Sequence, residues 1–200
     1  MPNKVVVTGF GAFGVHERNP SADVAKALAT SPPSDCIIHT EELRVAYDEV
    51  SDAVPRLWEE HDPDLIIHIG VHPERECIKL ERQSFPDGYC REDVDGRVPN
   101  DNCCTKDIQN VLKCGIDLDG VVAETREAMA KGEIPSCVRI ETSDDPGRYL
   151  CGFSYFLSLA KDNTKALFIH IPVVDEEKGV TIDAMARIVA CVIETIFKGF

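Results

Sequence analysis

"DLIIHIG", residues Asp64–Gly70, is an apolar run of the length of one buried β-strand. "KVVVTG", residues Lys4–Gly9, is a second short run and is rich in β-branched residues. Between them, residues 47–61 carry apolar side chains at helical spacing, at Val50, Val54 and Leu57. Strands that alternate with helices predict an α/β fold, a three-layer α/β/α sandwich around a mostly parallel twisted sheet.

The rest of the chain continues this alternation. Further strands are expected over residues 36–45, 77–83, 137–142 and 165–172, and further helices over 21–30, 118–131, 148–161 and 181–198. Ser21 is a candidate cap for the first helix. Residues 87–114 are poorly patterned, and a loop of that length in a compact domain is usually functional or mobile.

Composition limits the classes of function. A length of 200 residues fits one domain, residues 1–200, with a substantial core. Lysine and arginine number 21 and aspartate and glutamate 35, which gives a net charge of −14. Such an acidic chain repels nucleic acid and anionic membranes, so neither is expected as a partner. Because residues 1–10 lack the apolar run of a secretory signal, we expect a cytoplasmic protein.

Nine cysteines are present, an odd number that cannot pair completely within one chain. In the cytoplasm they are expected to be reduced. No C-x-x-C motif occurs, and the adjacent Cys103 and Cys104 have no histidine nearby in sequence. The ligand spacing of a zinc site is therefore missing, and we expect neither a metal nor a cofactor.

Candidate site residues lie at the ends of several of the predicted strands. Phe10 follows the first strand, Val71 and His72 follow the third, and His170 lies near the end of the last. The turn before Cys151 follows the predicted strand over 137–142. Ligands bind beyond the carboxyl ends of parallel strands, so these segments are expected to converge at one edge of the sheet.

Cys151 is the candidate nucleophile of that edge. Asp145 and Pro146 are expected to start the next helix, whose dipole would favour a thiolate. His170 is then the candidate base, and Glu81 the candidate group that orients the imidazole. The alternative is that Cys151 is only a small core residue and His170 a structural one.

The segment "GFGAFG", Gly9–Gly14, resembles a phosphate-binding loop but lacks the G-K-[ST] ending of a P-loop. Its alternating glycines and phenylalanines favour an apolar pocket approached by flexible backbone. The residues alone therefore predict an α/β protein, with a thiol hydrolase as one possibility.

Four segments resemble the pyroglutamyl-peptidase I family of cysteine peptidases, and together they span nearly the whole chain. They are "VVVTGFGAFG" with "NPS" at Asn19, "HIGV" with "IKLER", "SDDPGRYLCGFSYF", and "FIHIP". The resemblance implies a catalytic set of Glu81, Cys151 and His170 in a thiol exopeptidase. The adjacent cysteines after a Gly-Tyr loop resemble the animal branch of this family.

The resemblance also implies how the substrate binds. Small peptides with an N-terminal pyroglutamate would be the substrates, with Phe10 and Phe13 lining an apolar pocket for the lactam ring. The backbone of Val71 would pair with the ring amide, and Asn19 would support the pocket or its loop. A free ammonium would be costly to desolvate there, which favours the blocked amino terminus.

Some positions depart from the family pattern. Pro146 stands where alanine is usual, and Gly152 stands where asparagine or aspartate often follows the nucleophile. Bacterial members carry glutamine near Val71, and they carry an arginine after the glutamate segment that supports the oxyanion. Arg97 is the nearest candidate for that arginine, and backbone amides near Cys151 are the alternative donors.

Two alternatives come from other functional classes. One is an inactive relative that binds blocked peptide ends, suggested by Pro146 and Gly152. The other is a redox-responsive protein that acts through Cys103 and Cys104. Analogy with animal-type relatives favours a monomer, although a homo-oligomer is the other possibility.

Overall fold

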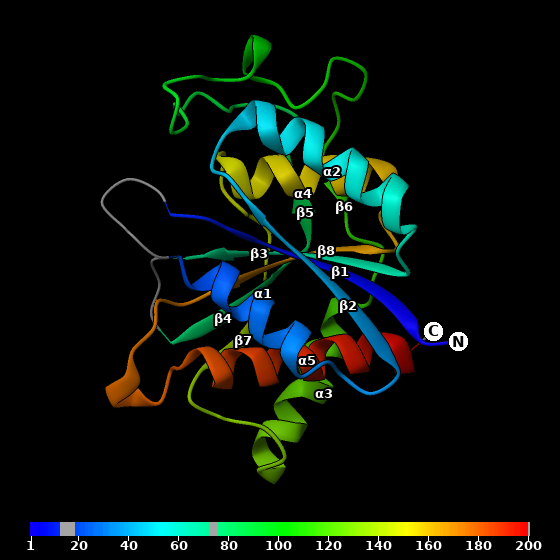
Figure 1. Cartoon of the computed structure of the whole chain (residues 1–200), viewed down its shortest axis with the longest axis vertical. Coiled ribbons are helices and arrows are strands. Elements are labelled where there is room, and N and C mark those ends of the chain that lie inside the picture. The colour runs from blue at the N-terminus through cyan, green and yellow to red at the C-terminus, as the bar shows by residue number, and fades with distance from the viewer. Residues whose placement is uncertain (13–18, 73–75, 200) are drawn as a thin grey trace.

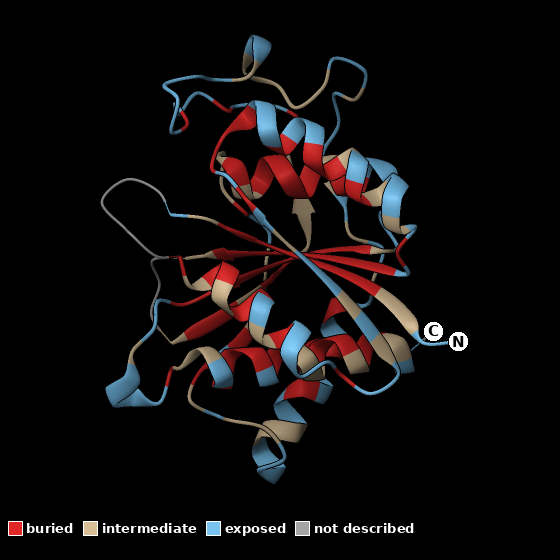
Figure 2. Cartoon of the chain, in the orientation of Figure 1, coloured by how far each residue is buried: buried red, intermediate tan, exposed pale blue. Residues whose placement is uncertain are grey.

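The computed structural model describes residues 1–12, 19–72 and 76–199. Figure 1 shows three layers, with a central sheet between two layers of helices. Buried residues concentrate in the sheet and on the helix faces that cover it (Figure 2). The predicted α/β/α sandwich is therefore confirmed.

The main sheet has six strands in the order β2, β1, β3, β8, β4, β7. Their bounds are Cys36–Leu43 for β2, Asn3–Phe10 for β1, Leu65–Val71 for β3, Ala166–Ile171 for β8, Cys77–Glu81 for β4 and Arg139–Ser143 for β7. The first four strands are parallel, whereas β4 pairs antiparallel with β8 and parallel with β7. A separate two-stranded sheet joins β5 (Gln83–Ser84) to β6 (Leu112–Lys113).

The direction of β7 corrects one step of the sequence argument. Because β4 and β7 run opposite to β8, the carboxyl end of β7 does not share the edge where β1, β3 and β8 end. The following segment, residues 144–149, carries the chain on to a helix that lies antiparallel to β8. The expected convergence is present, but this helix and not the end of β7 produces it.

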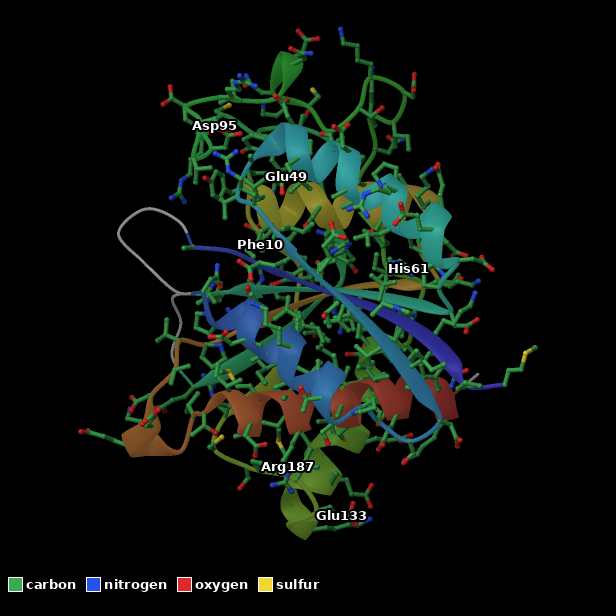
Figure 3. The ribbon with its side chains drawn as sticks, viewed as in Figure 1. Phe10, Glu49, His61, Asp95, Glu133 and Arg187 are labelled. Carbon is green, nitrogen blue, oxygen red and sulfur yellow. The ribbon has the colours of Figure 1, made fainter. Side chains whose placement is uncertain are left out.

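Helices α2 (Tyr47–His61) and α4 (Leu150–Lys161) cover one face of the sheet. The core on this face gathers aromatic side chains from the sheet, from α4 and from the segment after β5, among them Phe10 (Figure 3), Phe168, Phe153 and Tyr89. The irregular segment before β6 lies beyond these two helices (Figure 1) and contains a short 3₁₀ turn at Asn100–Asn102.

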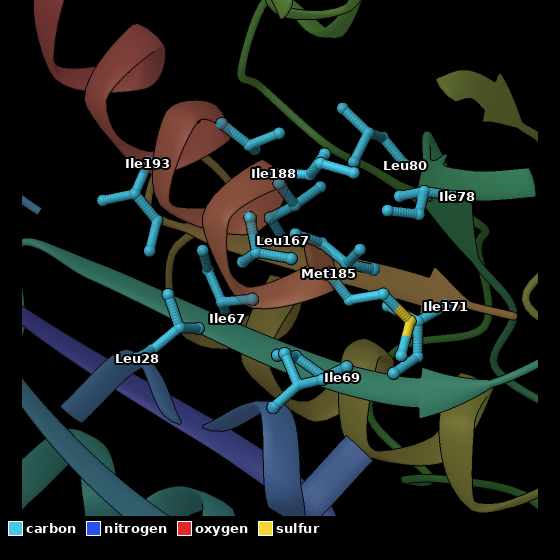
Figure 4. Close-up of a cluster of buried hydrophobic side chains, with 14 of the residues drawn as sticks. Leu28, Ile67, Ile69, Ile78, Leu80, Leu167, Ile171, Met185, Ile188 and Ile193 are labelled. Atoms are coloured by element: carbon cyan, nitrogen blue, oxygen red, sulfur yellow. The ribbon is translucent and has the colours of Figure 1, made fainter. Parts of the chain in front are cut away.

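Helices α1 (Pro20–Thr30), α3 (Leu118–Lys131) and α5 (Ile182–Lys198) cover the other face. Aliphatic side chains of β3, β4 and β8 pack there against α5 (Figure 4). A second 3₁₀ turn, Glu176–Lys178, precedes α5. Within the described ranges, no helix is long and apolar enough to span a bilayer.

Asn19, and not Ser21, caps helix α1. The Asn19 Oδ1 accepts a hydrogen bond from the Ser21 amide at 3.2 Å, and Pro20 occupies the first helical position. The Ser21 hydroxyl instead donates to Asn19 and accepts from the Phe10 amide at 2.9 Å. Both polar side chains therefore tie the beginning of α1 to the end of β1.

Helix α4 begins at Leu150, not at Asp145 and Pro146 as predicted. Gly147 has a φ of 79°, a left-handed conformation that stops a helix from forming there. The Asp145 carboxylate accepts from the Gly147 amide at 3.0 Å and closes a turn instead of a helix cap. As a result, Cys151 is the second residue of the helix.

Candidate active site

Glu81, His170 and Cys151 form one connected group on the α4 face of the sheet. The Nδ1 atom of His170 lies 2.7 Å from Oε1 of Glu81, and both side chains are buried. The Cys151 thiol lies beside the imidazole and is one of the groups that raise the pKa of His170. Because Nδ1 faces the carboxylate, Nε2 is the nitrogen left for the thiol. The geometry therefore connects the three residues in the order carboxylate, imidazole, thiol.

Electrostatics favour a protonated imidazole in this group. Burial alone would lower the pKa of His170, but the hydrogen bonds and charges of Cys151 and Glu81 outweigh it and raise the pKa to about 9. An imidazolium next to a thiol stabilises the thiolate, which is the nucleophilic form. The imidazole is thus placed to stabilise negative charge on the sulfur.

The helix position of Cys151 adds to this effect. Helix geometry leaves the first amides of α4 without acceptors inside the helix, and the helix dipole is positive at this end. The N-cap residue Tyr149 provides no side-chain acceptor. The amino end of α4 is therefore suited to stabilise negative charge on the thiol or on a nearby oxygen.

Gly70 of β3 makes room for the thiol. A Cβ atom at this position would lie 2.8 Å from Cys151 Sγ and 2.8 Å from a ring carbon of Phe168, closer than side-chain atoms can pack. Gly70 pairs in register with His170 across β3 and β8. A glycine is therefore needed where the helix brings the sulfur against the sheet.

Gly152 has a steric explanation. A Cβ atom at this position would lie 2.2 Å from the Gly147 carbonyl oxygen, which is backbone and cannot move aside cheaply. The left-handed turn at Gly147 and the glycine after the thiol thus fit each other. The turn at Gly147 therefore explains why this chain has glycine at position 152, where the family often has asparagine or aspartate.

A pocket of about 390 Å³ opens beside the thiol. It is lined by Phe10, Asn19, Val45, Val71, His72, Arg91, Asp145, Pro146, Gly147, Tyr149, Leu150, Cys151 and His170. Its residues come from the ends of β1 and β3, from β8, from the beginning of α4 and from the segment after β5. These elements lie far apart in sequence and meet at one edge of the sheet.

Three of the four residues predicted to bind substrate line this pocket. Phe10 is buried at the end of β1, and Val71 is the half-buried last residue of β3. Asn19 is nearly buried, and its side-chain amide donates to the Gly11 carbonyl at 3.2 Å. Phe13 lies outside the described residues.

Arg97 does not reach the pocket. Its guanidinium pairs with Asp48 at 2.6 Å on the exposed side of α2. Arg91 of the same segment lines the pocket instead, with its guanidinium 4.3 Å from the centre of the Tyr149 ring. Sequence reasoning missed Arg91 and Tyr149 because an irregular loop has no periodicity from which a register can be read.

All nine cysteines are free thiols in the structure. Burial raises the pKa of Cys104 to about 12, so its thiolate is scarce at neutral pH. This disfavours the redox role considered for Cys103 and Cys104. Over the described ranges of the chain, no three histidine, cysteine or acidic side chains are grouped as metal ligands would be.

Similarity to known proteins agrees with this geometry. Residues 1–175 match the family described as "Putative pyroglutamyl peptidase PgaPase_1". The human protein "Pyroglutamyl-peptidase 1" is 32% identical over 191 residues, covering 95% of this chain and 88% of that protein. The chain belongs to the pyroglutamyl-peptidase family.

Archaeal members of the pyroglutamyl-peptidase family are more distant in sequence. The "Pyrrolidone-carboxylate peptidase" of Pyrococcus furiosus is 28% identical over 182 residues, covering 87% of this chain and 83% of that protein. The solved pyrrolidone carboxyl peptidase of Thermococcus litoralis superposes with a TM-score of 0.84 at 21% identity, over 98% of this chain and 94% of its own. The fold is thus shared along almost the whole length.

Proposed function

We propose that this protein is a cysteine exopeptidase that removes the N-terminal pyroglutamyl residue from small peptides. The observation that carries the proposal is the connected set Glu81, His170 and Cys151 at the edge of a pocket of about 390 Å³. Membership of the pyroglutamyl-peptidase family supports the same substrate class. Residues 1–200 then act as one catalytic domain, and the cytoplasm is the proposed location.

The proposed reaction has two steps. The Cys151 thiolate attacks the pyroglutamyl carbonyl, and His170 gives its proton to the leaving amine as the peptide bond breaks. A water molecule then attacks the thioester while His170 takes up the water proton, which releases pyroglutamate and restores the thiolate. Glu81 holds the tautomer of the imidazole and stabilises its cation throughout.

The pocket supports selection of a neutral ring. Phe10 and Val71 provide apolar surface beside the thiol. Among the described residues that line the pocket, the one carboxylate is Asp145, which is largely exposed. A free ammonium would find no buried carboxylate among these residues, whereas a lactam buries only one amide. Phe13 is proposed to complete the ring site.

Arg91 is proposed to support the developing oxyanion in place of Arg97. Its guanidinium lies in the pocket, and the first amides of α4 provide further donors. Preorganised donors of this kind typically contribute a factor of about 10²–10³ to kcat.

The decisive experiment is hydrolysis of a fluorogenic pyroglutamyl amide by the reduced protein. Turnover by the parent and its loss in Cys151→Ser, with an unchanged fold, would support both the activity and the nucleophile. Cys191→Ser, a half-buried thiol on α5, is the matched control and should retain full turnover. No turnover by the folded parent would contradict the proposal and favour a binding protein for blocked peptide ends.

Assembly is part of the proposal. A monomer is proposed, because the proposed chemistry uses groups of one chain only. Sedimentation of the active protein at the assay concentration tests this, and activity confined to a dimer would contradict it.

A further inference from the structure

The loop that carries Arg91 is organised around one buried carboxylate, Asp93, which is 8% exposed. Its Oδ2 accepts from the Tyr47 amide at 2.9 Å, and its Oδ1 accepts from the amides of Asp95 at 2.9 Å and Arg97 at 3.0 Å. Burial alone would raise the pKa of Asp93, but these three amides outweigh it and hold the pKa below its ordinary value.

Asp93 also replaces a missing helix cap. The N-cap residue of α2 is Ala46, whose side chain cannot accept a hydrogen bond, and Tyr47 is the first residue of the helix. The Asp93 carboxylate occupies that place although it is 46 residues away in sequence. Residues 91–97, here called the Asp93 turn, are therefore docked on the beginning of α2.

Further bonds hold the Asp93 turn in place. The Val94 amide donates to the Val45 carbonyl at 3.2 Å, and Arg44 pairs with Asp95 at 2.6 Å. Figure 3 shows Asp95 on the loop above the first turns of α2, where Glu49 is labelled. These bonds therefore attach the Asp93 turn to the beginning of this helix.

Tyr47 connects the Asp93 turn to the nucleophile. Its hydroxyl donates to the Arg91 carbonyl at 3.0 Å, and its ring packs edge-to-face on Tyr149 with centroids 6.0 Å apart. The Arg91 guanidinium lies over the Tyr149 ring, and Tyr149 is two residues before Cys151. Within the described part of the chain Arg91 makes no salt bridge, and the residue lines the pocket.

We propose that Tyr47 and Asp93 are positioning residues of the reaction, which hold Arg91 at the correct place relative to Cys151. Neither needs to touch the substrate. Tyr47 fixes the Arg91 backbone and the Tyr149 ring that lies beneath the guanidinium. Asp93 holds the Asp93 turn, which carries Arg91, on the beginning of α2. The inference rests on the proposed function in one respect, since it assumes that the Arg91 charge acts on the reacting group.

A double-mutant cycle on kcat tests the link between Tyr47 and Arg91. Arg91→Ala is expected to lower kcat about 10²-fold, and Tyr47→Phe about tenfold by letting the guanidinium shift. In the double variant, loss of the hydroxyl should change nothing beyond Arg91→Ala, because there is no guanidinium left to position. Equal losses in both backgrounds, or no loss in Tyr47→Phe, would overturn the proposal.

Controls separate positioning from general destabilisation. Thr125→Val removes another buried hydroxyl, one that donates to a backbone carbonyl of α3 on the far face, and should lower stability without changing kcat. Asp93→Asn keeps an acceptor for the Tyr47 amide and should retain more of the parent kcat than Asp93→Ala. If kcat instead follows the melting temperature across all these variants, the residues are merely structural.

A second readout does not depend on peptidase activity. The alkylation rates of Cys151 by iodoacetate and by neutral iodoacetamide are compared, with the modified peptide measured by mass spectrometry. The guanidinium attracts the anionic reagent, so the ratio should fall severalfold in Arg91→Ala and also in Tyr47→Phe. Turnover failure of the parent would contradict the proposed function, whereas an unchanged ratio in both variants would contradict the positioning role.

Discussion

Two buried histidines lie on neighbouring strands of the same sheet and behave in opposite ways. His68 of β3 and His170 of β8 both face α4. The Phe168 ring packs against both, with its centroid 6.4 Å from that of His68 and 4.7 Å from that of His170. The pKa of His170 is raised to about 9, whereas burial lowers the pKa of His68 to about 3. Burial is nearly complete at both positions, so burial alone does not decide the charge.

The difference lies in the partners. His170 contacts the Glu81 carboxylate and the Cys151 thiol, which gain from a positive imidazole. His68 contacts the hydroxyls of Thr8 and Ser158, each at 2.7 Å. These hydroxyls carry no charge that could compensate for the desolvation of an imidazolium. Cys151 and Ser158 are seven residues apart on the same helix face, so α4 gives one histidine a chemical partner and the other a structural one.

Replacing each histidine with asparagine is the strongest test of the difference between them. His170→Asn keeps an N–H donor for Glu81 but removes the base, so kcat/KM should fall about 10³–10⁴-fold. His68→Asn should keep kcat/KM of the folded protein within about twofold and lower the melting temperature instead, because buried hydroxyls lose a partner. Both quantities are measured on both variants, and a large loss of activity in His68→Asn at full folding would refute the division.

Glu81→Gln gives His170 an uncharged hydrogen-bond partner, as His68 has. This variant removes the negative charge that orients and stabilises the His170 imidazole, but the imidazole itself remains as the base. The loss in kcat should therefore be about 10–10²-fold, milder than in His170→Asn. The activity of the parent should decline as the pH rises through about 9 and the imidazolium is lost. In Glu81→Gln this decline should begin at lower pH, and a pH–rate profile with an unmoved alkaline limb would mean that Glu81 does not act on His170.

Gly70→Ala tests the close approach of the thiol to the sheet. The added methyl group would stand 2.8 Å from Cys151 Sγ and 2.8 Å from a ring carbon of Phe168, so the sulfur and the ring must both shift. We expect a loss of about tenfold in kcat/KM from this misplacement. Gly199→Ala, where the nearest atom would be 3.6 Å away, is the control and should change nothing. Parent-like turnover by Gly70→Ala would show that the sulfur position is not limiting.

The low pKa of His68 should also make the stability of the protein depend on pH in the acid range. The folded pKa of this histidine, about 3, lies below the ordinary value, so between pH 6.5 and 3 the unfolded state binds more protons. Stability should therefore fall as the pH decreases through this range, by at most about 1.4 kcal/mol per pH unit from this group. Denaturant unfolding of the parent and of His68→Asn compares the two slopes, and equal slopes would contradict the assignment.

The sequence predicted the layers, the strands and the three linked residues because these depend on local patterns. Apolar runs such as residues 64–70 have the length of one buried strand, and family-like motifs surround Glu81, Cys151 and His170. The proximity of the three side chains in the structure agrees with that prediction, while their catalytic roles stay predictions until variants are assayed.

The errors fell where local patterns were ambiguous. Asp145 and Pro146 have the composition of a helix start, but the left-handed Gly147 delays the helix to Leu150. Arg97 and Arg91 were indistinguishable in an irregular segment, and only their contacts separate them, one on Asp48 and the other over the Tyr149 ring.

Residue type and spacing were enough to identify the side chains that can do chemistry and the apolar faces. They could not show which histidine contacts a carboxylate and a thiol and which contacts hydroxyls, because that depends on how the strands and α4 pack. His68 and His170 are both single histidines in apolar strands. Their hydrogen-bond partners Thr8, Ser158 and Glu81 lie 60 to 90 residues away in sequence. Long-range packing sets that choice, because electrostatic interactions in a buried site depend on distance and not on sequence separation.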